Sequence, residues 1–299
     1  MEQLRLALDW TPNTNHIGFF VAKDLGFYEK VGLEVTLLNP ADDDYATTPA
    51  KKVEKGLADL ALSPFESVIS YRTKEQPFDA VALATVFQED LSAIVVLEES
   101  TIKRPKDLDG KTYASYKARY EDEIVKQMII NDGGHGVLHL HYPAKLGIWE
   151  TLLNKEYDAT WIFMNWEGVQ ARDKGVGLRQ FKLADYGAPY GYSPIILASK
   201  KVVKKQKLKY EAFLTATKEG YLFAKNEVSK AIDILSVYIP EHERQIDLLK
   251  SQFESIKAYG ADDTWGKMDK KAVCRFLDWL CTHKLETTRL TYEDLVWQG

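Results

Sequence analysis

The sequence predicts an α/β protein built of two lobes. Short apolar runs alternate with helix-forming stretches in two successive series, and the last third of the chain is almost wholly helix-forming. Strands and helices in alternation, with short connections, favour parallel sheets covered by helices. Two such series in 299 residues, followed by helices that must pack back onto one of them, indicate two lobes.

The first series alternates strictly between the two kinds of element. Its first helix is expected to end at Gly26 or Gly32 and its second at Gly56, because glycine adopts the conformation that terminates helices. The expected strands cover 5–10, 33–39, 57–63 and 79–87, and the expected helices cover 16–32, 47–56 and 65–75.

The second series begins with a strand at 92–99 and a short helix that leads into a strand over 106–116. Strands at 137–143, 157–163 and 193–199 and helices at 120–132, 145–156 and 165–175 complete it. The basic run KKVVKKQKLK (200–209) is interpreted as a solvated helix start and linker. Helices are then expected at 209–227, 228–239, 243–260 and 270–285.

The composition indicates which classes of molecule the protein binds. A net charge of −5 and a pI near 5.8 lack the basic footprint of nucleic-acid-binding proteins, so no nucleic acid is expected. Seven Trp and sixteen Tyr exceed the needs of a core, and such rings stack on flat ligands. Cys274 and Cys281 lie two helical turns and about 10 Å apart, too far for a disulfide, and are interpreted as core residues.

The cellular location has two interpretations. No run approaches the ~20 apolar residues of a membrane helix, and no leader is recognisable after Met1. The chain is expected to be periplasmic, or extracellular and lipid-anchored, as a mature protein; it is cytoplasmic if the missing leader is natural. A monomer is expected.

Signatures of catalysis and of metal binding are weak. The chain has no dinucleotide fingerprint, P-loop, GxSxG elbow, HExxH or CxxC motif. His139 and His141 alternate on an expected strand with His135 nearby, but a catalytic zinc usually has three ligands, or two with a carboxylate. We therefore expect no metal and no cofactor.

The loops that follow the strands are expected to hold the site, because open parallel sheets bind ligands at the carboxyl ends of their strands. DWTPNTNH (9–16) follows the first strand, and its residues either cap the next helix or line a pocket. NWEG (165–168) and DYGAPYGYSP (185–194) contribute aromatic and acidic residues, either as a stacking wall or as packing over a lobe boundary. These residues are Trp166, Glu167, Tyr186, Tyr190 and Tyr192.

Two further loops have both a structural and a functional interpretation. In SPFES (63–67), Ser63 is expected to cap the next helix, with Pro64 at its first position and Glu66 in its first turn. The same geometry can also aim Ser63 and Glu66 at a ligand. In SYKARYEDE (115–123), Lys117 and Arg119 either grip an anion at a helix N-terminus or face water while Ser115 caps the turn.

Several segments together resemble a known family. DWTPNTNHIGFFVAKDLGFYEKVGLEVTLL and KVEKGLADLALSPFESVISYRTKEQPFDAVA are similar to the periplasmic-binding-protein-like family of thiamine-pyrimidine synthases and of bacterial binding proteins for the pyrimidine precursor. KDLDGK (106–111) and DYGAP (185–189) resemble the formylaminopyrimidine-binding proteins of ABC importers, and the similarity spans residues 4 to about 200.

The resemblance implies a type II periplasmic-binding-protein fold, in which two α/β lobes close on a ligand in the cleft between them. Lobe I would comprise 1–90 plus 193–299 and lobe II 91–192, with crossovers near 88–93 and 188–194. The C-terminal helices would thus return to the first lobe.

The resemblance also separates the two chemistries of the family. The synthases use a lysine that anchors pyridoxal phosphate and a histidine that is consumed as the pyrimidine source, and these positions fall on Ser63 and Ser67. Their cysteine-rich motif falls at YGYSP (190–194), which has no Cys, and their glycine-containing phosphate loop at SYKARYE, which has no Gly. These departures predict a binding protein without catalytic residues.

The implied ligand-binding residues come from both lobes. Trp10 would stack on a flat heterocycle, and Glu167 would pair with the amine and ring N–H of an aminopyrimidine. Lys117 and Arg119 leave open whether the ligand carries an anionic group. The full set is Trp10, Asn13, His16, Ser63, Glu66, Tyr116, Asn165, Glu167, Tyr186, Tyr190 and Tyr192.

The expected function is that of the solute receptor of an ABC importer, with the permease as partner and a thiamine-related pyrimidine (formylaminopyrimidine or hydroxymethylpyrimidine) or similar flat heterocycle as ligand. One alternative is a cytoplasmic enzyme resembling the thiamine-pyrimidine synthases. Others are a receptor for another solute, such as a sulfonate, and a cytoplasmic ligand sensor.

Overall fold

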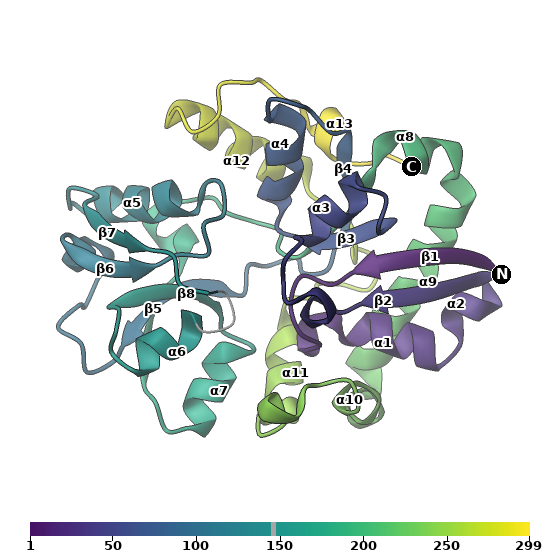
Figure 1. Cartoon of the computed structure of the whole chain (residues 1–299), viewed down its shortest axis with the longest axis horizontal. Coiled ribbons are helices and arrows are strands. Elements are labelled where there is room, and N and C mark those ends of the chain that lie inside the picture. The colour runs from purple at the N-terminus through teal and green to yellow at the C-terminus, as the bar shows by residue number, and fades with distance from the viewer. Residues whose placement is uncertain (145–147) are drawn as a thin grey trace. The chain divides into compact units, whose positions relative to one another are not determined.

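The structure is a computed structural model that describes residues 1–144 and 148–299, and the chain forms two compact units (Figure 1). Unit 1 comprises Met1–Asp90, Gly191–Val273 and Leu290–Gly299, and unit 2 comprises Leu91–Tyr190 and Cys274–Arg289.

The C-terminal segment Cys274–Arg289 belongs to unit 2, whereas the sequence-based division assigns all of 193–299 to lobe I. Side-chain contacts explain this difference. The ring of Phe276 packs edge-on against Tyr190, with centroids 5.8 Å apart. The Glu286 carboxylate accepts hydrogen bonds from Arg119 and Tyr120.

Unit 1 is built on a five-stranded sheet of order β2-β1-β3-β10-β4. Its strands are β1 (Glu2–Ala7), β2 (Leu33–Leu38), β3 (Leu60–Ser63), β4 (Ala80–Thr85) and β10 (Ile195–Ser199). β1 pairs in parallel with β2 and β3, placing Leu6 opposite Leu60, while β10 runs antiparallel between β3 and β4. β3, β4 and most of β10 are buried apolar runs, as expected for strands covered on both faces.

Helices cover this sheet on both faces, with α3 on one side and α1 and α2 on the other (Figure 1). The helix expected over 16–32 is divided in two, because Gly26 adopts a φ of 69° between α1 and α2. The helices are α1 (Ile17–Asp24), α2 (Phe27–Lys30), α3 (Pro49–Glu54), α4 (Phe65–Thr73), α8 (Lys200–Lys205), α9 (Lys207–Asn226), α10 (Val228–Ser236), α11 (Leu248–Lys257) and α13 (Tyr292–Leu295). α12 (Lys270–Thr282) begins in unit 1 and ends in unit 2.

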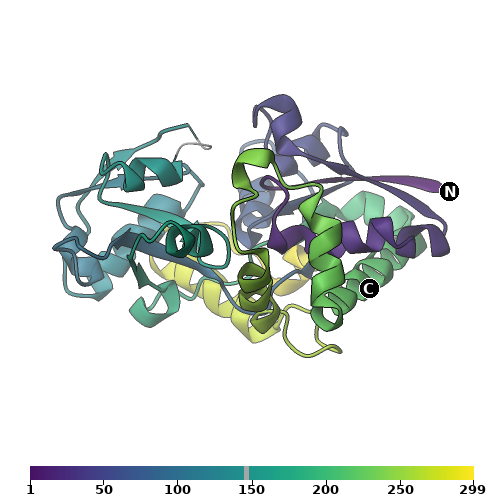
Figure 2. The same ribbon diagram turned by 90° about the horizontal axis from the view of Figure 1, so that it is seen from below.

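Helix α1, which follows the DWTPNTNH segment, packs along α9 (Figure 2). The two helices approach so closely that a methyl group added at Gly220 would overlap the carbonyl oxygen of Gly18. One at Gly18 would overlap the ring of Tyr221. Glycine at both positions is therefore required by the close approach of the two backbones.

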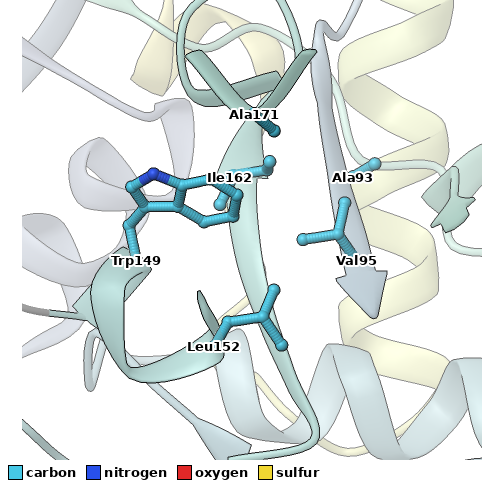
Figure 3. Packing of buried hydrophobic residues seen from close by; sticks show 6 residues of the cluster. All are labelled: Ala93, Val95, Trp149, Leu152, Ile162 and Ala171. Atoms are coloured by element: carbon cyan, nitrogen blue, oxygen red, sulfur yellow. The ribbon is translucent and has the colours of Figure 1, made fainter. Parts of the chain in front are cut away.

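Unit 2 repeats the arrangement of unit 1 with a sheet of order β7-β6-β8-β5-β9. Its strands are β5 (Ser92–Leu97), β6 (Lys111–Ala114), β7 (Leu138–His141), β8 (Ala159–Phe163) and β9 (Leu178–Phe181), and its helices are α5 (Glu121–Asn131), α6 (Ile148–Leu153) and α7 (Glu167–Asp173). The helix expected over 145–156 corresponds to α6, and residues 145–147 lie outside the described residues. On one face, β5, β8, α6 and α7 enclose the apolar cluster of Figure 3, formed by Ala93, Val95, Trp149, Leu152, Ile162 and Ala171.

Both sheets are mixed, whereas the alternation of strands and helices predicts purely parallel sheets. In each unit the exception is the strand by which the chain enters from the other unit: β10 in unit 1 and β5 in unit 2. β9 is an additional strand that the sequence analysis does not predict, because its short, half-polar pattern LRQF carries little signal. Within the described part of the chain, no helix has the length and apolar character needed to span a membrane.

Candidate ligand-binding residues at the strand ends

In unit 1, three segments meet at the edge of the sheet where β1 and β3 end and β10 begins. Ser63, at the end of β3, lies opposite Ile195, at the start of the antiparallel β10. The backbone N–H of Phe65 donates to the carbonyl oxygen of Tyr192 at 3.1 Å, which joins two of the segments. The third segment is DWTPNTNH, which follows β1. The structure thus brings Trp10, Asn13, His16, Ser63, Glu66 and Tyr192 to one edge of unit 1.

Asn13 organises the turn of DWTPNTNH by capping the 3₁₀ helix Thr14–His16. Its Oδ1 accepts from the Asn15 N–H at 2.8 Å, and its Nδ2 donates to the Thr11 carbonyl at 3.0 Å. Asn is a favoured residue at this position because its side chain satisfies a free N–H at the start of a helix. The capping role considered for this stretch is therefore present in the structure.

His16 is completely buried and uses both ring nitrogens within the same turn. Nδ1 accepts a hydrogen bond from the Asn13 N–H at 3.3 Å, and Nε2 lies 2.8 Å from Asp9 Oδ1. A nitrogen that accepts from an N–H carries no proton, so Nε2 carries it and donates to the Asp9 carboxylate. Asn13 and His16 thus shape this edge of unit 1 through internal hydrogen bonds.

Side chains of helices α9 and α11 form hydrogen bonds with the same turn. The Thr14 hydroxyl lies 2.7 Å from that of Ser251 and accepts a hydrogen bond from the Ser255 hydroxyl at 3.1 Å. The buried Tyr221 hydroxyl donates to the Asn15 carbonyl at 2.6 Å. These contacts anchor the turn that follows Trp10 to α9 and α11.

Trp10 is half-buried, and the Tyr45 ring packs against its ring edge at a centroid distance of 5.3 Å. Burial raises the pKa of Tyr45 to about 12, and the carboxylates of Glu243 and Asp9 contribute to the shift. Tyr45 is a candidate that sequence reasoning missed, although it lies between β2 and α3, in a loop at the carboxyl end of a parallel strand. Its position after a parallel strand is the signal that marks it, because ligands of open α/β sheets bind at the carboxyl ends of the strands.

Ser63 does not cap α4. It remains part of β3 and pairs with Ile195, so the helix begins at Phe65 and Pro64 takes the N-cap position without a side-chain hydrogen bond. The expectation of a Ser63 cap with Pro64 as the first helical residue is therefore wrong. The Ser63 side chain is only 4% exposed, and its hydroxyl has no hydrogen-bond partner among the described residues. Glu66 lies in the first turn of α4, as expected, and is buried.

In unit 2, the parallel neighbours β6 and β8 bring the segments that follow them to one edge. Tyr116 lies in the loop after β6, Asn165 in the loop after β8, and Glu167 at the first residue of α7. Asn165 is buried, and Glu167 folds back so that its Oε2 accepts from the Phe163 N–H at 3.0 Å. Burial raises the pKa of the Tyr116 hydroxyl, and the carboxylates of Glu167 and then Glu121 raise it further. Two carboxylates therefore act on the Tyr116 hydroxyl at this edge.

The charged residues of SYKARYEDE interact within the chain. Arg119 donates to Glu286 Oε2 at 2.8 Å, and the Lys117 ammonium lies 5.3 Å from the centre of the Tyr142 ring. Ser115, the expected cap, accepts from the Lys117 N–H at 3.0 Å and donates to Asp122 at 2.6 Å.

The three tyrosines expected to form one wall are divided between the units. Tyr186 packs edge-on against Phe181 in unit 2, with ring centres 6.2 Å apart. Tyr190, also in unit 2, packs against Trp161 at 5.0 Å. Tyr192 belongs to unit 1, where its hydroxyl accepts from the Asp269 N–H at 2.8 Å.

The histidines of HGVLHLH lie on or near the edge strand β7, and the ring of His141 stacks on that of Tyr157 at 4.7 Å. Across residues 1–144 and 148–299, no group of three His, Cys, Asp or Glu side chains is arranged to hold a metal ion.

Comparison with known proteins identifies relatives of two kinds. The sequence model of the family described as NMT1/THI5 like matches residues 13–231. The formylaminopyrimidine-binding protein of Halalkalibacterium halodurans is 24% identical over 294 residues, covering 95% of this chain and 86% of that protein. The 4-amino-5-hydroxymethyl-2-methylpyrimidine phosphate synthase of Legionella pneumophila is 22% identical over 242 residues, covering 80% of this chain and 74% of the synthase.

Among solved structures, the alkanesulfonate-binding protein SsuA of Xanthomonas axonopodis pv. citri matches with a TM-score of 0.75 at 13% identity. The match covers 99% of this chain and 98% of that protein. It confirms the predicted fold class, the two-lobe α/β fold of periplasmic binding proteins.

Proposed function

We propose that this chain, which belongs to the NMT1/THI5-like family, is the solute-binding protein of an ABC importer and binds a thiamine-related pyrimidine. The fold of a periplasmic binding protein and the relative named for formylaminopyrimidine binding support this function. On this proposal the mature protein is a periplasmic or extracellular monomer that delivers its ligand to a membrane permease. The ligand is a formylaminopyrimidine or hydroxymethylpyrimidine, which the protein binds and releases without chemical change.

The observation that carries the proposal is the Ser63 hydroxyl. It is buried at the carboxyl end of β3 and lacks a hydrogen-bond partner among the described residues. A buried polar group in this state is costly, and a ligand that bonds to it removes the cost. The sequence resemblance assigns the pyridoxal-phosphate lysine of the synthases to this position, where this chain has serine. Serine forms no Schiff base, so the side chain can hydrogen-bond a ligand but cannot anchor pyridoxal phosphate.

The other residues fit an aminopyrimidine. Such a ring has a flat face and several N–H donors along one edge, and carboxylates accept from those donors. The half-buried Trp10 offers a stacking surface in unit 1. Glu66 in unit 1 and Glu167 in unit 2 supply carboxylates at the strand ends.

A thermal-unfolding screen tests the proposal, using hydroxymethylpyrimidine, formylaminopyrimidine, thiamine, pyridoxal phosphate and an alkanesulfonate. A ligand at a hundred times its Kd should stabilise the folded protein by about 2.7 kcal/mol. We expect this shift with at least one of the two precursor pyrimidines. No shift with any pyrimidine contradicts the proposal, and a shift with the sulfonate alone supports the related receptor function.

The alternative of a synthase-like enzyme is supported by the relatives with that name. It is tested by absorbance spectroscopy after incubation with pyridoxal phosphate. A protein-bound aldimine band would favour the enzyme over the receptor. The variant Ser63→Lys is a positive control, because it restores the amine that the band requires.

A further inference from the structure

The basic run KKVVKKQKLK (200–209), which the candidate ligand-binding residues do not include, forms α8 and the start of α9 in unit 1. It holds six lysines and no acidic residue, although the whole chain has a net charge of −5. Every residue from Lys201 to Leu208 is exposed except Val203, which is buried. The run is therefore a concentrated positive surface on an acidic protein.

Only part of this charge is neutralised within the chain. The ammonium of Lys207 lies 3.6 Å from the Glu211 carboxylate, and that of Lys209 lies 3.9 Å from Glu2. The lysines whose side chains form no ion pair in the part of the chain that the structure describes are Lys201, Lys204 and Lys205. Their charges are available to a partner outside the chain.

Large apolar side chains are exposed among and beside these lysines. Leu208 is 82% exposed and Val202 is 38% exposed. Leu57, which precedes β3, is 52% exposed and lies near β1, because the Arg5 guanidinium donates to the carbonyl of the adjacent Gly56 at 3.1 Å. Isolated exposed aliphatic side chains are ordinary, but their placement within a lysine-rich surface favours a partner that is both charged and apolar.

This surface lies at the amino ends of the strands of unit 1. Lys209 approaches Glu2 at the start of β1, and the backbone N–H of Lys200 donates to the carbonyl of Asp79, just before β4, at 2.8 Å. Figure 1 shows the N-terminus, α2 and α8 at the same end of unit 1. The candidate ligand-binding residues of unit 1 lie at the opposite edge, where β1 and β3 end.

An anionic lipid surface matches both properties of this region. Anionic headgroups attract each nearby lysine, which is worth about fivefold in affinity. Aliphatic side chains add affinity when they enter the boundary between the headgroups and the acyl chains. A nucleic acid would bind the same lysines through its phosphates but would leave Leu208 and Val202 in water. The combination of lysines and aliphatic side chains therefore favours a membrane.

We propose that the amino-edge surface, defined as Leu57 and residues 201–208, binds the face of a membrane that contains anionic lipids. In this contact the unpaired lysines lie among the headgroups and Leu208 enters the apolar boundary beneath them. The opposite edge of unit 1, with its candidate ligand-binding residues, then faces away from the bilayer. The inference goes beyond the proposed function and does not depend on the identity of the ligand.

Titration of the whole chain with vesicles tests the proposal. The wild type should bind vesicles of about 30% phosphatidylglycerol in phosphatidylcholine at about 0.05 M NaCl, and bind pure phosphatidylcholine at least about tenfold more weakly. Most of the binding should be lost at about 0.5 M NaCl, because salt screens the lysines. The combined variant Lys201→Gln, Lys204→Gln and Lys205→Gln should lose about a hundredfold in affinity, since each lysine is worth about fivefold.

The matched control is the combined variant Lys174→Gln, Lys182→Gln and Lys271→Gln. These lysines are exposed and lie outside the amino-edge surface, so the control has the same net charge as the first variant but an intact surface. Its affinity for the anionic vesicles should stay within about threefold of that of the wild type, because distant surface charges are largely screened.

Leu208→Gln distinguishes a membrane from a nucleic acid. It removes an exposed aliphatic side chain without changing the charge, and glutamine is also a good helix former. Affinity for the anionic vesicles should fall at least about threefold, because the apolar contribution is lost. Leu249→Gln, at an exposed position of α11 outside the amino-edge surface, is the control and should leave vesicle binding unchanged.

The proposal is overturned if the wild type does not bind the anionic vesicles at about 0.05 M NaCl, or if the two combined lysine variants bind them equally well. It is also overturned if a DNA oligonucleotide binds as tightly as the vesicles and Leu208→Gln has no effect, since the surface would then be a general polyanion-binding patch. Vesicle binding without any pyrimidine binding would reject the proposed function alone, so the two proposals can fail separately.

Discussion

Replacing His16 with alanine should destabilise the folded chain by about 3 kcal/mol. The side chain is completely buried, and its two ring nitrogens connect the Asp9 carboxylate to the Asn13 N–H. Alanine supplies neither bond and leaves part of the ring volume empty. The turn that carries Trp10 would then lose the side chain that holds its two ends together.

The magnitude follows from three losses of about 1 kcal/mol each. The bond to Asp9 is charge-assisted, but the Asp9 side chain is 22% exposed, so water replaces part of what is lost. The N–H of Asn13 is left buried without its acceptor, which adds the cost of an unsatisfied donor. The missing ring removes apolar surface from a packed environment, and the neighbours relax only partly into the space.

The assay is urea unfolding followed by tryptophan fluorescence, from which the free energy of unfolding in water is extrapolated. His242→Ala is the matched control, because that histidine is 74% exposed in its side chain and should cost less than about 0.5 kcal/mol. A loss below about 1 kcal/mol for His16→Ala would show that the turn holds its shape without this side chain. The reasoning about DWTPNTNH would then be refuted.

Four further predictions concern ligand contact, packing and pH. Ser63→Ala removes a buried hydroxyl without a described partner, so the free energy of unfolding without ligand should rise by up to about 1 kcal/mol while ligand affinity in calorimetry falls; a drop in stability would contradict this. Trp10→Ala should weaken ligand binding at least about tenfold and change stability by less than about 1 kcal/mol, because the residue is only partly buried. Gly220→Ala forces a methyl group into the backbone of α1 and should cost about 3 kcal/mol or more in urea unfolding. The Arg104 guanidinium lowers the pKa of Asp132, so this pair stabilises the fold above the unfolded pKa of about 3.9, and the contribution is lost as the pH falls through the lowered folded pKa. The urea midpoint of Arg104→Gln should therefore lie below that of the wild type at pH 7, and the difference should shrink as the pH is lowered below about 3.9.

The sequence by itself determined the class of the protein, because that information is local. Apolar runs of strand length alternate with helical periodicity twice, and this pattern is set by neighbouring residues along the chain. The family was also evident from continuous segments, chiefly DWTPNTNH with the helix that follows it and GLADLALSPFES. Gly26 indicated the end of a helix because glycine readily adopts the positive φ found there, a preference that depends on this one residue.

Tertiary structure decided how those same residues are used. Ser63 has the sequence signature of a helix cap, but pairing with Ile195 from a distant part of the chain keeps it in a strand and leaves its hydroxyl buried. The structure groups the segment Cys274–Arg289 with unit 2 through the contacts of Phe276 and Glu286, whose partners lie far away in sequence.

In the candidate site, too, some features follow from the sequence and others only from the fold. Its loops were predictable, because the carboxyl ends of parallel strands meet at one edge of a sheet. The partners of its side chains were not: a sequence shows that Glu121 follows SYKARY, but not that its carboxylate turns back to accept from Tyr116 and Ala118. Periodicity reports which face of an element is buried, whereas hydrogen-bond partners depend on distances that exist only once the chain has folded.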